Sequence, residues 1–60
     1  MPTKIYTTNG IFEVGDSIEQ IVHQINSQKN PPFVFQSKIV DEDRKVLIMA
    51  QEIVALEESY

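Results

Sequence analysis

The chain has 60 residues, no cysteine and a formal net charge of −4. Its length allows one small domain over residues 1–60, and the missing cysteines exclude disulfides and thiolate metal sites. Five basic residues against nine acidic ones are too few to neutralise a run of phosphates, so we expect no nucleic-acid and no membrane partner. Domains of this size are often stabilised by self-association, which we expect here.

Residues 4–14 are expected to form a β-hairpin. Asn9-Gly10 is the preferred pair for a two-residue type I′ turn, because both central residues of that turn adopt positive φ. Such a turn would place Thr7 opposite Phe12. Alternation would then put four residues on the face that contacts the helix: Ile5, Thr7, Phe12 and Val14.

Residues 17–29 are expected to form an amphipathic helix. Asp16 or Ser17 can cap its start, and Asn30 followed by Pro31 ends it. Four apolar residues at i, i+3, i+4 and i+7 form one stripe, namely Ile18, Ile21, Val22 and Ile25.

The chain after the prolines favours β-structure. Residues 33–40 and 45–50 are predicted strands joined by a charged turn, and residues 53–57 form a last strand. Nearly every position of 45–50 is apolar, which predicts burial on both faces or cover by another subunit. The expected fold is α+β, in the order β-β-α-β-β-β, with a C-terminal antiparallel meander. In the alternative, ββαβα, residues 44–57 are helical, which would place Glu57 unfavourably near the negative end of that helix.

At this level the chain resembles small uncharacterised β-β-α-β-β-β domains of Gram-positive bacteria and their phages. The resemblance is carried by Ile11-Phe12-Glu13-Val14 leading to Asp16-Ser17-Ile18, and by Ile53-Val54-Ala55-Leu56-Glu57-Glu58. It implies a fold and no activity. No apolar run approaches the roughly 20 residues that cross a bilayer, and no signal peptide is visible, so we expect a cytoplasmic protein.

Pro2 is the sharpest candidate for catalysis. Removal of Met1 would leave a secondary amine, and the chain then resembles the small tautomerases, which use an N-terminal proline as a general base. The resemblance consists of Pro2 and the overall length. In the tautomerases the first strand leads directly into a long helix, and arginines hold an acidic substrate. Here Asn9-Gly10 folds the chain back first, and Arg44 is the sole arginine.

His23 and the acidic turn are weaker candidates. His23 lies one helical turn from Glu19 and from Ser27, but side chains on an exposed helix surface point into water and offer no oxyanion site. Residues 41–43 are followed by two basic residues and lack the central glycine of a calcium loop. We therefore expect no catalytic residue, no cofactor and no metal site.

An apolar sheet surface remains, because one helix cannot cover both faces of a five-stranded sheet. Patches of this kind mark contact surfaces. The leading hypothesis is a non-catalytic interaction module that forms a homodimer through a sheet face or an edge strand. The alternatives are a small acidic inhibitor that binds a basic surface of another protein, and the tautomerase-like enzyme. The expected interface residues are Tyr6, Ile11, Val34, Val40, Leu47 and Met49.

Overall fold

The structure, a computed structural model, describes residues 1–59. The order of elements confirms the predicted α+β class, with an N-terminal hairpin, a helix and C-terminal strands. The alternative helix over residues 44–57 is wrong, since two strands and a short 3-10 turn occupy this range. The elements are β1 (Thr3–Thr7), β2 (Gly10–Val14), α1 (Ile18–Asn26), β3 (Val34–Lys38), β4 (Lys45–Met49), the 3-10 turn η1 (Ala50–Glu52) and β5 (Ile53–Glu58).

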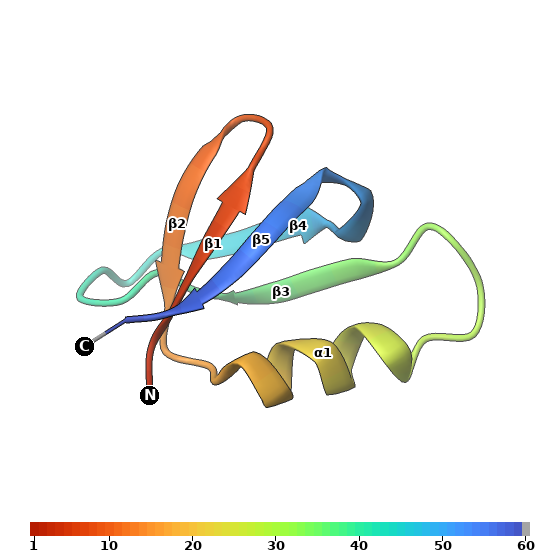
Figure 1. Ribbon diagram of the computed structural model, residues 1–60, viewed down its shortest axis with the longest axis horizontal. Helices are drawn as coiled ribbons and strands as arrows, with labels where there is room; N and C mark the ends of the chain where they lie inside the picture. The colour runs from red at the N-terminus through yellow and green to blue at the C-terminus, as the bar shows by residue number, and fades with distance from the viewer. Residues whose placement is uncertain (60) are drawn as a thin grey trace.

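The strands form two antiparallel sheets rather than one. β1 lies between β2 and β5, and β3 pairs with β4 alone. The predicted meander therefore stops at β4, because η1 turns the chain away and β5 crosses to β1, as Figure 1 shows. Pairing with β1 places Leu56 opposite Ile5 on the inner face. Each sheet can then bury its apolar face against the other, which a single flat sheet under one helix could not do.

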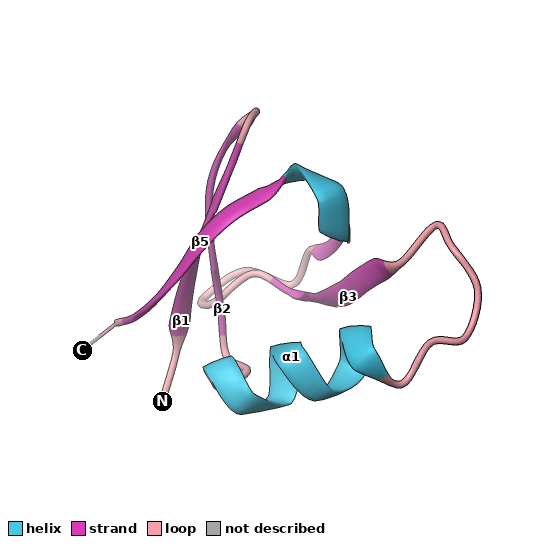
Figure 2. Cartoon of the chain, turned by 45° about the vertical axis from the view of Figure 1, so that its right-hand side comes forward, coloured by secondary structure: helices cyan, strands magenta, loops and turns pink. Residues whose placement is uncertain are grey.

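The core lies where the two sheets and the helix meet. Both sheets and α1 contribute to it, and α1 runs beside β3 in Figure 2. Its fully or nearly fully buried apolar residues are Ile5, Val14, Ile21, Phe35 and Ile48. Phe35 and Ile48 face each other across the β3–β4 pair, so the same pair that joins these strands anchors them in the core.

The first hairpin forms with a register two residues away from the predicted one. Ile5 lies opposite Phe12, and the turn consists of Thr8 and Asn9, neither of which adopts positive φ. The Thr7 hydroxyl stabilises this turn instead, since it accepts from the Asn9 N–H at 3.1 Å and donates to the Gly10 carbonyl at 2.8 Å. A shift by an even number of residues keeps every side chain on its predicted face.

The helix begins as predicted and ends earlier. Ser17 caps it and forms a reciprocal capping box with Gln20. It ends at Asn26, where the Ser27 N–H and hydroxyl both donate to the His23 carbonyl, so Asn30 is not its terminus. Within residues 1–59, no helix is long and apolar enough to cross a membrane.

Candidate interaction surface

Two glutamine side chains, one in α1 and one just after it, bond to the outer edge of β3. Gln24 accepts from the Gln36 N–H at 2.8 Å and donates to its carbonyl at 3.4 Å. Gln28 accepts from the Val34 N–H at 3.0 Å and donates to its carbonyl at 2.5 Å. Each side-chain amide thus takes the place of a peptide group of a neighbouring strand.

This closure involves the end of α1 and the turn that follows it. Gln24 lies in α1, and Gln28 lies two residues beyond the last helical residue, where its N–H donates to the Ile25 carbonyl at 3.3 Å. Their partners Gln36 and Val34 are two residues apart on the strand, a separation of about 6.6 Å. The end of α1 and the turn after it therefore lie along β3 and take the place of a neighbouring strand. Sequence reasoning missed both glutamines, whose one signal is their i, i+4 spacing.

The outer edge of β4 has no such cover. The Ala50 N–H donates to the Phe33 carbonyl and the Ile39 N–H to the Arg44 carbonyl, one pair beyond each end of the β3–β4 ladder. Alternation then directs the peptide groups of residues 45, 47 and 49 away from β3. Among residues 1–59, β4 pairs only with β3, and no other backbone hydrogen bond joins this outer side to a neighbour.

Leu47 lies at the centre of this open edge with 63% of its surface exposed. A groove of about 160 Å³ separates the strand from the tip of the β1–β2 hairpin. The tip is held in place, since the Thr8 N–H donates to the Glu52 carbonyl at 3.1 Å and its hydroxyl to the Glu52 carboxylate at 2.5 Å. The groove is lined by Thr7, Asn9, Phe12, Leu47, Ile48, Met49 and Glu52.

Charge is distributed unevenly along this edge. Its first residue, Lys45, lies directly opposite Lys38, an unfavourable like-charge pair in a chain that is acidic overall. Lys38 has an exposed contact with Asp43 at 3.5 Å, which offsets little of this repulsion. The other end of the edge leads into η1 and Glu52. The open edge is therefore basic at its start, apolar in the middle and acidic beyond its end.

The two outer strands of the larger sheet are better protected than β4. The end of β2 is covered, since the Val40 N–H donates to the Glu13 carbonyl at 2.8 Å and Val14 bridges to Ile39. β5 has an irregular register near its start and carries two glutamates at its end. Bulges and charged residues are devices that discourage strand addition. β4 has only Lys45 for this purpose.

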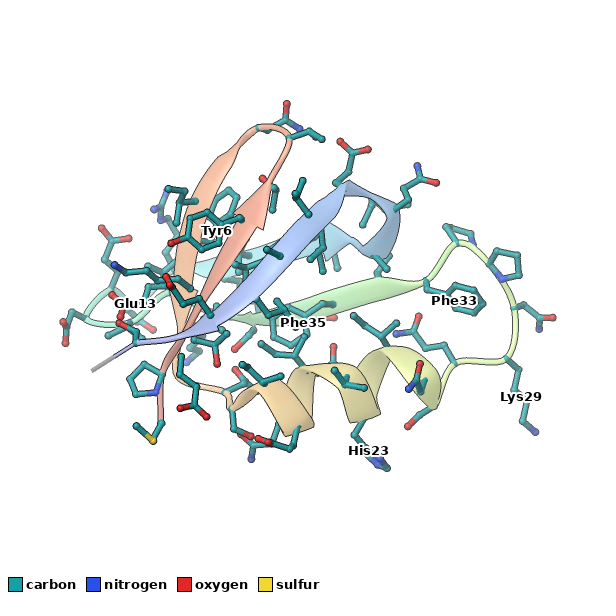
Figure 3. All side chains as sticks on the ribbon, in the orientation of Figure 1. Tyr6, Glu13, His23, Lys29, Phe33 and Phe35 are labelled. Atoms are coloured by element: carbon teal, nitrogen blue, oxygen red, sulfur yellow. The ribbon has the colours of Figure 1, made fainter. Side chains whose placement is uncertain are left out.

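The six expected interface residues do not share one surface. Tyr6 and Ile11 are opposite each other on the outer face of the larger sheet, and Figure 3 shows the Tyr6 ring outside that sheet. Val40 lies in the loop after β3. Three of the six lie together on the β3–β4 face opposite Phe35, with Met49 directly across from Val34 and Leu47 beside them.

The residues considered for catalysis lie apart from each other. Pro2 is half-buried, and its carbonyl accepts from the Ser59 N–H at 2.9 Å. His23 points away from the sheets in Figure 3, and the Ser27 hydroxyl donates to the main chain of His23 rather than to its ring. Arg44 is exposed and contacts Glu42 at 2.9 Å. Among residues 1–59, no three acidic or histidine side chains gather as a metal site.

The outer face of the larger sheet holds a polar cross-strand pair. The Tyr6 hydroxyl donates to the Glu57 carboxylate at 2.6 Å. This hydrogen bond, with smaller effects from desolvation and from the carboxylate charge, raises the pKa of Tyr6 above its ordinary value of 10.0. The pair joins β1 to β5 and gives the Tyr6 hydroxyl a hydrogen-bond partner.

Comparisons with protein-family models, with curated proteins and with solved structures give no match for this chain.

Proposed function

We propose that this chain is a non-catalytic protein-interaction module that receives an extended strand of a protein on the outer edge of β4. The observation that carries the proposal is the difference between the two edges of the β3–β4 pair. Gln24 and Gln28 bond to the peptide groups of Gln36 and Val34 on one edge, whereas the other edge presents unpaired peptide groups around an exposed leucine.

Strand addition supplies affinity through backbone hydrogen bonds and selectivity through side-chain contacts. Leu47 provides the apolar contact, and the groove beneath the hairpin tip leaves room beside the strand. Self-association is the first case to test, because a small domain without disulfides gains stability from a second copy.

Sedimentation equilibrium tests this proposal with two matched variants. Leu47→Lys places a charge at the centre of the open edge, and Val54→Lys places the same charge at a valine of β5 that is 70% exposed. We expect the native chain and Val54→Lys to associate from micromolar concentration upward, and Leu47→Lys to stay monomeric. A monomeric native chain up to millimolar concentration contradicts self-association, and dissociation by Val54→Lys alone would assign the contact to β5.

A further inference from the structure

We infer that the strand received by β4 is β4 of a second copy, in an antiparallel register in which Leu47 faces Leu47 of that copy. This inference rests on the proposed function and adds the identity of the partner and the pairing register. The inference depends on the alternation of hydrogen bonds in the β3–β4 ladder. This alternation directs the peptide groups of residues 45, 47 and 49 away from β3.

Hydrogen-bond phase restricts the possible registers. In an antiparallel pair, directly opposite residues either both direct their peptide groups toward each other or both direct them away. Residues 45, 47 and 49 of one copy must therefore lie opposite residues 45, 47 or 49 of the other. Only the register centred on Leu47 pairs all five residues of both strands. Any shift leaves at least two residues of each strand unpaired.

Charge favours the same register. The centred pairing places Lys45 opposite Met49 of the second copy, so the two lysines stay apart. It also places Arg44, which contacts Glu42 of its own copy at 2.9 Å, opposite Ala50 at the start of η1 of the second copy. The paired residues 45–49 therefore bring no like charges together on either side of the twofold axis. A register with Lys45 facing Lys45 would add a like-charge contact to the one already present with Lys38.

The resulting sheet has four strands in the order β3-β4-β4-β3, with each outer edge closed by Gln24 and Gln28 of its own copy. Pairing of this kind therefore stops at two copies, because no unprotected edge of the smaller sheet remains for a third. The two Leu47 side chains, which are mostly exposed in one copy, cover each other at the centre.

Cysteine trapping tests the register, since the native chain contains no cysteine. In the centred register the two Leu47 Cα atoms lie about 5.5 Å apart, inside the range of roughly 4.4–6.8 Å that a disulfide bridges. The two Lys45 Cα atoms lie about 14 Å apart, since four steps of about 3.3 Å along the strand combine with about 5.5 Å between the strands. Leu47→Cys should therefore form covalent dimers under mild oxidation, whereas Lys45→Cys alone should not. A mixture of Lys45→Cys and Met49→Cys should form mixed dimers.

Val54→Cys, at an exposed position of β5, measures the cross-linking that random collision produces. We expect Leu47→Cys to exceed this control at least tenfold. Cross-linking of Lys45→Cys with itself, or Leu47→Cys at the level of the control while the native chain sediments as a dimer, overturns the register and leaves the proposed function standing. A native chain that stays monomeric, with Leu47→Cys at the level of the control, overturns self-association as well.

Discussion

The outer edges of β3 and β4 show how differently one small fold treats two equivalent strands. Both strands have five residues, pair with each other and contribute one fully or nearly fully buried residue to the core. The edge of β3 is occupied by the side-chain amides of Gln24 and Gln28, which take the place of a neighbouring strand. No residue in the range 1–59 gives the edge of β4 an equivalent cover. An unprotected edge is an aggregation hazard unless it has a partner, so the difference points to a surface kept open for binding.

The largest expected effect comes from removing a buried side chain that anchors both strands in the core. Phe35 is the largest fully buried side chain and lies opposite Ile48. Phe35→Ala should lower the free energy of unfolding by about 3–5 kcal/mol, because it leaves a cavity under both strands. For a 60-residue chain this is most of the total stability, and thermal unfolding followed by circular dichroism should show little cooperative transition.

Phe33→Ala is the matched control, since Phe33 is 37% exposed and lies just before β3. It should lower stability far less. Equal losses in the two variants would show that the β3–β4 pair is not anchored through Phe35.

The second-largest effect is expected from a variant that opens the edge of β3, so that it resembles the edge of β4. In the double variant Gln24→Ala with Gln28→Ala, β3 loses the amides that close its edge. We expect a loss of about 2 kcal/mol in stability, because water replaces part of the lost hydrogen bonding. We also expect association beyond the dimer, measured by light scattering, because a second open edge allows continued strand pairing.

Gln36→Ala is the control for the double variant, because Gln24 bonds to the main chain of Gln36 and not to its side chain. This variant should keep both the stability and the association state of the native chain. A loss as large as that of the double variant would mean that glutamine side chains in general, rather than the closed edge, stabilise this region.

The smallest effect concerns the larger sheet, which serves as a reference region. Because the pKa of Tyr6 is raised in the folded chain, its contribution to stability is complete below the unfolded pKa near 10 and is lost as pH rises through the folded pKa. Chemical unfolding at rising alkaline pH should show a small loss of stability from this group, and Tyr6→Phe should lack that part of the pH dependence. An unchanged pH profile in Tyr6→Phe would show that the contact with Glu57 does not persist in solution.

Local features of this fold were predictable from the sequence, and distant pairings were not. The capping box at Ser17 and the alternation in β2 and β3 depend on residues that are close together in the sequence. The start of the helix and the positions of these strands could therefore be predicted. β5 pairs with β1 because of the direction in which η1 turns the chain. No periodic pattern of apolar residues in the sequence indicates that direction. The turn at Thr8 was missed because the Thr7 hydroxyl competes with the usual preference of Asn9-Gly10.

The candidate surface was only partly predictable for the same reason. Leu47 and Met49 could be selected as apolar residues without a covering helix. Their place on an open edge could not, because it follows from the pairing of β5 with β1 instead of with β4. The closed edge of β3 was missed too, because it depends on the contacts of Gln24 and Gln28. Polar helix residues that bond to a strand edge look like ordinary solvent-facing residues in a sequence.

Amide hydrogen exchange at high dilution, where any dimer is dissociated, tests the difference between the two edges most directly. The amides of Val34 and Gln36, which donate to the glutamine side chains, should exchange slowly, and those of Leu47 and Met49 should exchange fast. Raising the concentration should protect Leu47 and Met49 and leave Val34 and Gln36 unchanged. Equal protection of all four amides at high dilution would contradict the account, because β4 would then have no open edge to offer.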